Sequence, residues 1–369
     1  MQEGTTYVGL DAHKVRIHAA VRLPGEGQTV EQTFANTPET TRRWVRRLRR
    51  RAPGEIMCCY EAGPLGYALQ RELVAQGLRC QVIAPSLIPT KPGDHIKTDR
   101  RDARKLAELL EADLLTAVHP PTPAQEAVRD LCRAREAVKQ DQMRLRHRLS
   151  KFLLRRAVRW TVGRRAWTQA HDRWLRGLRF EHVADQAILD DHLLALDQIA
   201  GRLQALDTKL EAWATKPPYA EPVAWLRCFR GIDTRTALGI VTELHDWRRF
   251  PSPRPLMAYL GVVPSERSSG ERERRGGITR AGNRRVRRLL VEAAWHYRHR
   301  PTVSRELARR REGQPARVIA VADRAQQRLH ARYQRMLARG KPHNKVVVAM
   351  ARELVGFLWA TLEPQPSDA

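Results

Sequence analysis

The chain has 369 residues, enough for two or three domains, and its hydrophobic share of 42% excludes a disordered polycation. Lys+Arg number 67 against 40 Asp+Glu, and the net charge of +27 predicts a polyanionic partner, most often nucleic acid. The alternative is a ribosome-like or merely sticky basic protein. Five cysteines without a C-x-x-C pair argue against a zinc site or a disulfide framework and fit a reducing cytoplasm.

The first part, residues 1–115, has the pattern of an α/β domain. Short apolar runs predict strands at 6–11, 16–23, 28–34, 55–60 and 79–84, and helices are expected at 38–51, 64–77 and from Asp99 onwards. The order β-β-β-α-β-α-β-α predicts a mixed sheet with helices packed on it.

Four acids lie at the ends of predicted strands or at the start of a predicted helix, where α/β folds form ligand sites. Asp11 and Glu61 each end a predicted strand, and Asp99 and Asp102 lie one turn apart where the third helix opens. Taken singly, Asp11 fits a turn cap, Glu61 fits a helix entry, and first-turn aspartates complement a helix dipole. Because ligands bind outside the carboxyl ends of parallel strands, we expect the four carboxylates to converge on divalent cations, Mg²⁺ or Mn²⁺.

Three stretches carry a family resemblance. YVGLDAHK, YEAGPLGYAL and KTDRRDARKLAELL resemble the N-terminal domain of the DEDD transposases of the IS one-ten family of bacterial insertion sequences. The resemblance implies an RNase H-like fold in its RuvC-like form. It also implies a catalytic metal-binding tetrad of Asp11, Glu61, Asp99 and Asp102. His13 and Lys14 match the family pattern without an assigned chemistry.

The second part, residues 116–222, is basic and predicted to be helical. After a proline-rich linker at 119–123, apolar residues at helical spacing predict long helices at 124–156 and 183–213, joined by a basic turn. We interpret them as an antiparallel coiled-coil arm that dimerises and whose arginine-rich tip contacts a phosphate backbone. The alternative is a solvated hairpin packed on its own domain. Trp160, Trp167 and Trp174 either stack on unpaired bases or form a helix core stripe.

The third part, residues 223–369, is predicted to be mainly helical. Gly231-Ile232-Asp233 precedes a helix opening near Thr234, which resembles half of a helix-hairpin-helix module. Further on, 258–288 contains Ser268 and Ser269, expected turns at Gly276-Gly277 and Gly282-Asn283, and many arginines. Such a serine is either a turn former or a nucleophile toward a phosphodiester, and the residues alone favour the turn former.

The same run resembles the C-terminal transposase domain of the IS one-ten family, in which a serine beside a glycine is the nucleophile. The resemblance therefore implies Ser269, with Ser268 as the alternative, and makes Asn283 and Arg287 supporting residues. Helices are expected at 291–298 and 345–362. The arginines expected to contact nucleic acid are Arg267, Arg272, Arg274, Arg275, Arg280, Arg284, Arg285 and Arg287.

Together these features predict a DNA transposase or recombinase of an insertion sequence. The family implies a homo-oligomer, dimer or tetramer, with composite active sites, and an element-encoded guide RNA. One alternative is a RuvC-like junction or strand endonuclease that uses water, and another is a non-catalytic nucleic-acid-binding protein. We expect a soluble cytoplasmic protein, associated with the nucleoid when it acts. The apolar stretch 346–362 contains Arg352 and Glu353, which favours a buried helix over a membrane span.

Overall fold

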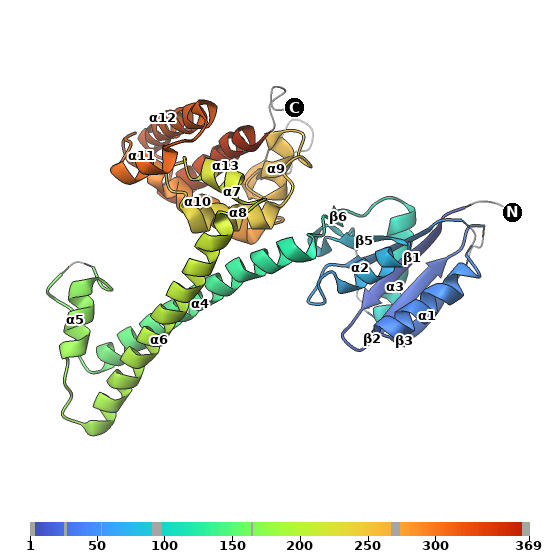
Figure 1. The fold of residues 1–369 in the computed structure, drawn as a ribbon, viewed down its shortest axis with the longest axis horizontal. Coiled ribbons are helices and arrows are strands. Elements are labelled where there is room, and N and C mark those ends of the chain that lie inside the picture. Colours follow the sequence, from blue (N-terminus) through green and yellow to red (C-terminus); the bar gives the residue numbers. More distant parts are fainter. Residues whose placement is uncertain are drawn as a thin grey trace. The chain divides into compact units, whose positions relative to one another are not determined.

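One mixed sheet organises the first unit, Met1–Pro121, with the strand order β3-β2-β1-β4-β5-β6 (Figure 1). The computed structural model describes residues 4–25, 28–52, 54–90, 98–163, 165–266 and 274–363. Strands β1, β2 and β3 are antiparallel neighbours, β4 and β5 continue parallel to β1, and β6 is antiparallel to β5. The predicted element order is confirmed. The two-residue strand β6 was not predicted, because two residues carry no periodicity.

The elements of the first unit differ little from their predicted bounds, except that the second helix begins later, after a turn at Gly63–Gly66. They are β1 (Thr6–Ala12), β2 (Arg16–Arg22), β3 (Thr29–Ala35), α1 (Pro38–Arg49), β4 (Ile56–Glu61), α2 (Ala68–Ala75), β5 (Arg79–Ile83), the 3₁₀ turn η1 (Pro85–Leu87), α3 (Asp99–Glu111) and β6 (Ala117–Val118).

The two faces of the sheet carry different helices. Successive residues of a strand point to opposite faces, so Val8 and Leu10 of β1 pack with Trp44 of α1 and Leu73 of α2. Gly9 and its partner on β2, Ala20, face the other way, toward α3. Asp11 follows Gly9 on that second face.

Small residues on β1, β2 and α3 allow α3 to pack close to the sheet. Gly9 pairs with Ala20 across β1 and β2, and Ala20 packs with Ala103 and Ala107 of α3. A Cβ atom built on Gly9 would lie 2.1 Å from the carbonyl oxygen of Ala103 and 2.4 Å from the amide nitrogen of Ala107. Only glycine fits there. Because Asp99 lies one helical turn before Ala103, this close packing also places Asp99 near the end of β1.

Two long helices form an arm in the second unit, Thr122–Ala369 (Figure 1). Helix α4 (Pro123–Arg155) begins with a capping box between Thr122 and Gln125, and α6 (Val183–Ala214) runs back antiparallel to it. Arg135 binds Asp207 at 2.7 and 3.2 Å near one end, while Phe152 packs with Leu189 at the other. Both predicted helices are confirmed, but the connection between them contains a further helix, α5.

The tryptophans of this connection gather around one histidine. The ring centroids of Trp160, Trp167 and Trp174 lie 5.1–5.3 Å from that of His171, and the guanidinium of Arg146 lies 4.9 Å from the Trp167 centroid. Of the two alternatives, the helix core stripe is wrong, because Trp160 and Trp167 lie outside helices. The rings instead form a small partly buried cluster at the end of the arm. Stacking on bases stays a prediction.

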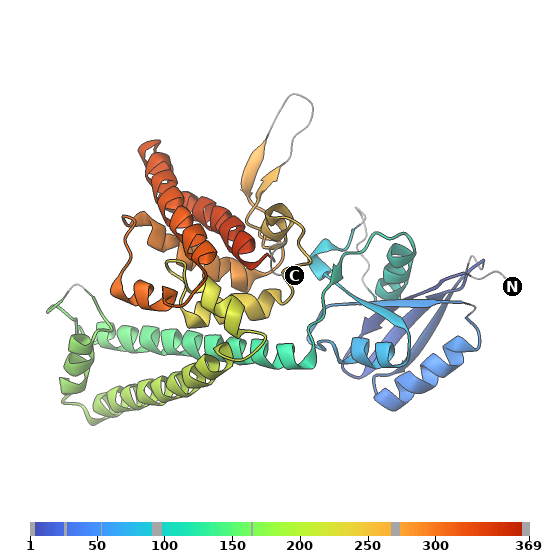
Figure 2. The ribbon, with the colours of Figure 1, turned by 45° about the horizontal axis from the view of Figure 1, so that its top comes forward.

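Helices α7, α8, α9, α10, α12 and α13 share one core, in which α13 is central. Helix α13 packs beside α12 and buries Val346, Met350 and Leu354 (Figures 1 and 2). Among the described residues, no helix is both long and apolar enough to cross a membrane. The elements of this unit are α4 (Pro123–Arg155), α5 (Gln169–Gly177), α6 (Val183–Ala214), α7 (Ala220–Leu226), α8 (Thr234–Leu244), α9 (Pro253–Tyr259), β7 (Pro264–Glu266), β8 (Arg275–Ile278), α10 (Arg284–Ala294), η2 (Trp295–Arg298), α11 (Arg305–Arg311), α12 (Ala316–Ala338) and α13 (His343–Leu362).

A short β-hairpin of β7 and β8 projects from these helices (Figure 2). The prediction of a turn at Gly276-Gly277 is wrong, since both residues lie in β8. The turn at Gly282-Asn283 is confirmed: Gly282 has a φ of +64°, and Asn283 is the N-cap of α10. The helix expected near Thr234 is also confirmed, with Asp233 as its N-cap.

Candidate active site

Carboxylates and imidazoles meet at the end of β1. Asp11 is contributed by β1, His18 lies opposite it on β2, His13 stands in the turn between these strands, and Asp99 opens α3. His13 Nε2 lies 3.2 Å from Asp11 Oδ2 and 3.6 Å from Asp99 Oδ1. His18 Nε2 lies 3.3 Å from Asp99 Oδ2. One ligand atom from each of Asp11, His13 and Asp99 falls within 4.8 Å of the others, so these three side chains can hold a metal ion.

The electrostatics of the cluster favour a bound cation. Burial raises the pKa of Asp11 above its ordinary value of 3.8; His13 opposes this shift, and the carboxylates of Asp99 and Asp102 add to it. The Asp11 side chain is only 19% exposed, so water screens this repulsion incompletely. Carboxylate oxygens are ligands that hard divalent cations prefer, and such a cation would relieve the repulsion. The residues present therefore fit a divalent metal.

The other two predicted acids, Asp102 and Glu61, lie outside this three-residue cluster. Asp102 lies in the first turn of α3, half-buried and close enough to Asp11 to raise its pKa. Glu61 is the exposed last residue of β4, and the pairing of Leu10 with Tyr60 puts it beside Asp11 at the strand ends. Glu61 is not part of the three-residue cluster. That all four acids form one metal site stays a prediction.

Neither His13 nor His18 was among the predicted site residues. The signal for His18 is present in the sequence, because a tight hairpin after Asp11 places a residue of the second strand directly opposite it. The observed register pairs Asp11 with His18. His13 matches the family pattern and lies two residues after Asp11, but its approach to Asp99 depends on the distance between β1 and α3, which the sequence does not give.

The predicted nucleophile cannot be placed. Ser269 and its alternative Ser268 lie outside the described residues, as do Arg267 and Arg272, and the side chain of Arg275 is likewise not described. The remaining predicted arginines divide into two groups. Arg274, Arg280 and Arg284 are exposed. Arg285 pairs with Glu136 at 2.6 Å, and Arg287 donates to the backbone carbonyls of Leu260 and Ala281.

Arg287 thereby fastens the base of the β7–β8 hairpin. Leu260 follows α9 before the hairpin, and Ala281 lies after it, so one guanidinium holds both ends at 2.8 and 2.7 Å. The two backbones also approach closely, since a Cβ atom on Gly282 would lie 1.8 Å from the carbonyl oxygen of Tyr259. The backbone at the base of the hairpin therefore forms a fixed frame.

A buried carboxylate connects this frame to the arm. Glu243 of α8 is 5% exposed at its side chain and accepts two hydrogen bonds from Arg133 of α4, at 2.7 and 2.9 Å. It accepts a third, at 2.9 Å, from the amide of Asn283, whose carbonyl oxygen caps α10. Three helices thus meet at one charge.

We expect Glu243→Gln to destabilise the protein by about 1–3 kcal/mol, because the two charge-assisted hydrogen bonds between Arg133 and the buried Glu243 carboxylate are lost. Burial raises the pKa of Glu243, but the bonds from Arg133 and Asn283 outweigh it and hold the pKa below its ordinary value of 4.5. The contribution of Glu243 is therefore present above pH 4.5 and is lost as the pH falls through the lowered pKa. Urea unfolding of the wild type and of Glu243→Gln, at pH 7 and below pH 4, measures this difference in the free energy of unfolding. A difference that is the same at both pH values would contradict the predicted pH dependence.

Comparison with known proteins agrees with these features. Residues 8–156 match the transposase family DEDD_Tnp_IS110, and residues 224–309 match the transposase family IS116/IS110/IS902. A Sinorhizobium fredii protein named as a transposase, y4qE, is 41% identical over 96% of this chain and 87% of its own length. The transposase for insertion sequence element IS1533 of Leptospira borgpetersenii is 34% identical over 91% of this chain and 97% of its own. The chain belongs to the IS116/IS110/IS902 family of transposases and is a DNA transposase.

Proposed function

We propose that this transposase cuts and rejoins DNA with a divalent-metal centre held by Asp11, Glu61, Asp99 and Asp102. The observation that carries the proposal is the convergence of Asp11 and Asp99 at the end of β1. A bound Mg²⁺ or Mn²⁺ supplies Lewis-acid stabilisation of charge on the scissile phosphate. The four carboxylates hold the ion, and the closely seated α3 sets the spacing between Asp99 and Asp11.

We infer an RNase H-like, RuvC-like fold for the first unit. The support is the topology: three antiparallel strands, then two parallel ones, in the spatial order β3-β2-β1-β4-β5. The four acids lie at the end of the first strand, at the end of the fourth strand, and at the start of the helix that follows the fifth.

Strand exchange is proposed to use a serine nucleophile, Ser269, with Ser268 as the alternative. The serine oxygen bonds to phosphorus, its proton is released, and the phosphorus–oxygen bond to one DNA end breaks. This leaves a phosphoserine ester and a free DNA hydroxyl, and a hydroxyl from a second strand later attacks the ester and frees the serine. The fixed base of the β7–β8 hairpin supports this, because a nucleophile must be positioned.

The wider organisation is also proposed. The chain is expected to work in three parts, 1–115, 116–222 and 223–369, with α4 and α6 as a coiled-coil arm that joins protomers into a dimer or tetramer. Metal centre and serine, contributed by different parts, would form composite sites in that oligomer. The excess of arginine is compatible with an element-encoded guide RNA beside the DNA, and the nucleoid is the expected place of action.

Trapping of the covalent intermediate tests the mechanism. Protein, element-end DNA, the flanking transcribed RNA and Mg²⁺ are incubated, denatured and separated on a gel, with Ser269→Ala, Ser268→Ala and Asp102→Asn as variants. A slow protein–DNA band that disappears in Ser269→Ala and Asp102→Asn is the expected result. Loss in Ser268→Ala alone moves the nucleophile to Ser268. Cleavage by every serine variant without a covalent band would instead indicate a RuvC-like endonuclease that uses water.

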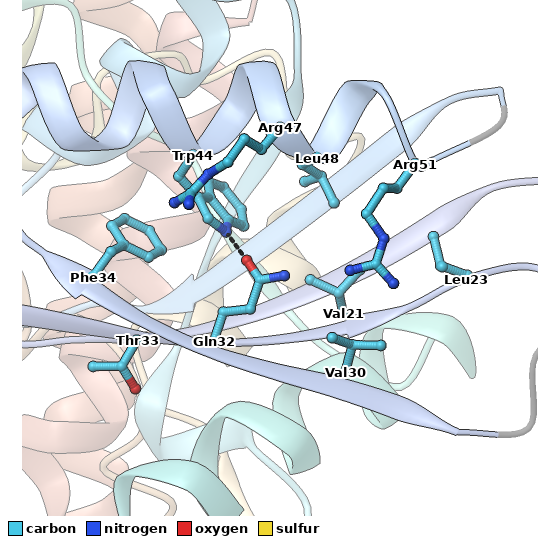
Figure 3. Close-up of a pocket in the computed structure, with 10 residues that line it drawn as sticks. All are labelled: Val21, Leu23, Val30, Gln32, Thr33, Phe34, Trp44, Arg47, Leu48 and Arg51. Atoms are coloured by element: carbon cyan, nitrogen blue, oxygen red, sulfur yellow. Dashed lines mark hydrogen bonds between the residues drawn. The ribbon is translucent and has the colours of Figure 1, made fainter.

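Helix α1 offers a phosphate-binding surface, which leads to a prediction about DNA binding. Helix α1 and the two residues that follow it carry four exposed arginines without ion pairs among the described residues, namely Arg46, Arg47, Arg50 and Arg51. Figure 3 shows Arg47 and Arg51 among the residues that line a cavity between α1 and strands β2 and β3. The volume of this cavity is about 410 Å³.

Replacing these four arginines by glutamine is expected to weaken DNA binding and flatten its salt dependence. Each lost phosphate contact lowers the slope of log Kobs against log[salt] by about 0.9. The matched control is Arg43→Gln, because Arg43 is already paired with Glu39 at 2.8 Å. If the slope of log Kobs against log[salt] is the same for the wild type and the four-arginine variant, these arginines do not contact DNA phosphates.

A further inference from the structure

We propose that His13 is a ligand of the divalent ion, so that the centre contains an imidazole nitrogen besides its carboxylates. The inference rests on the proposed metal centre and adds a residue outside the acidic tetrad. Among the described residues, the one group of side chains with metal-ligating geometry consists of Asp11, His13 and Asp99.

The distances are those of neighbouring ligands on one ion. An octahedral ion with bonds of about 2.1 Å places adjacent ligand atoms about 3 Å apart. His13 Nε2 lies 3.2 Å from Asp11 Oδ2 and 3.6 Å from Asp99 Oδ1. Small side-chain rotations therefore bring the three atoms onto one centre, with the remaining positions open to water, further carboxylates and phosphate oxygens.

The turn that carries His13 is held in place. The backbone amide of His13 donates to the backbone carbonyl of Arg16 at 2.9 Å, and the His13 carbonyl accepts from the side-chain amide of Asn36 at 2.8 Å. Asn36 also donates its own amide to the carbonyl of Val15 at 2.9 Å. The His13 side chain itself is 57% exposed and packs into no core, so its orientation toward the two aspartates comes from polar contacts, among them the 3.2 Å hydrogen bond with Asp11.

His18 has a different role, as a positioning residue for Asp99. Its Nε2 lies 3.3 Å from Asp99 Oδ2, and its Nδ1 lies 3.0 Å from the hydroxyl of Thr33 on β3. His18 is not in the group whose ligand atoms all lie within 4.8 Å of one another, and its Nδ1 is hydrogen-bonded to Thr33. A chain of contacts from Thr33 through His18 orients the Asp99 carboxylate, as outer-shell partners of metal ligands do.

An imidazole ligand changes which metals the site prefers. Carboxylate sites suit Mg²⁺, whereas a nitrogen ligand favours transition metals. The wild-type protein is therefore expected to bind Mn²⁺ more tightly than Mg²⁺. His13→Ala is expected to weaken Mn²⁺ binding at least about ten-fold and to narrow the difference between the two metals. His18→Ala is expected to weaken binding of both metals about 10–100-fold.

Electron spin echo envelope modulation of bound Mn²⁺ distinguishes the two histidines directly. The full chain without DNA is loaded with Mn²⁺, and the echo is examined for coupling to a ¹⁴N nucleus. We expect coupling in wild type, no coupling in His13→Ala, and retained coupling in His18→Ala at a saturating Mn²⁺ concentration. Asp11→Asn is expected to bind no Mn²⁺ at the concentration that saturates the wild type.

The outcomes separate this inference from the proposed function. If wild type binds Mn²⁺ and Asp11→Asn does not, yet no ¹⁴N coupling is seen, the metal centre stands and the role of His13 is overturned. Coupling that persists in His13→Ala overturns it as well. If wild type binds no Mn²⁺ at all, the proposed metal centre fails together with the inference.

Discussion

Asp11→Asn is expected to abolish transposition while making the metal-free protein more stable. Lewis-acid stabilisation by a bound metal contributes several kcal/mol, so its loss lowers the rate by about a thousand-fold or more. The gain in stability has a separate cause. In the folded protein, burial and the carboxylates of Asp99 and Asp102 raise the pKa of Asp11, although His13 opposes them, so ionised Asp11 destabilises the fold.

The pH dependence of this gain has a defined sign. Because the folded pKa lies above 3.8, the penalty appears as the pH rises above 3.8 and is complete once the pH exceeds the folded pKa. Asp11→Asn should thus have a higher Tm than wild type at pH 7, and the difference should vanish below pH 3.8. Adding Mn²⁺ should raise the Tm of wild type and leave that of the variant unchanged. A variant that is less stable at pH 7 without metal would mean that Asp11 has a structural role.

Much of the first unit could be predicted from residues alone. The strands are short apolar runs, and each predicted site acid follows such a run or opens a helix with an apolar stripe. Because those local patterns agree with one topology, the order of the elements and the positions of Asp11, Glu61 and Asp99 at strand or helix ends followed without coordinates.

The parts that could not be predicted depend on distances between elements. Nothing local in the sequence states that Gly9 and Ala20 let α3 approach β1, and this approach is what brings His13 and His18 to Asp99. In the second unit, glycines at 276 and 277 favour a turn locally, but pairing with Pro264–Glu266 makes them a strand.

Gly9→Ala is the second change with a large expected effect. The added Cβ would stand 2.1 Å from the Ala103 carbonyl oxygen and 2.4 Å from the Ala107 amide nitrogen, both backbone atoms that cannot rotate away. Helix α3 must move outward, at a cost of about 1–3 kcal/mol for an overpacked core. That movement carries Asp99 away from Asp11, and a displacement of about 1 Å at a catalytic group lowers a rate about a hundred-fold.

The control is Gly201→Ala on the exposed side of α6, where an added Cβ meets no atom within 4 Å. That change should stabilise the protein by up to about 1 kcal/mol, because alanine favours helix over glycine, and should leave Mn²⁺ binding by the first unit unchanged. Urea unfolding and transposition frequency are measured for both variants. If Gly9→Ala unfolds earlier but transposes normally, the spacing between α3 and β1 stabilises the fold without setting the active-site geometry. If Gly9→Ala also binds Mn²⁺ more weakly, the same glycine fixes both the helix and the distance between the two aspartates.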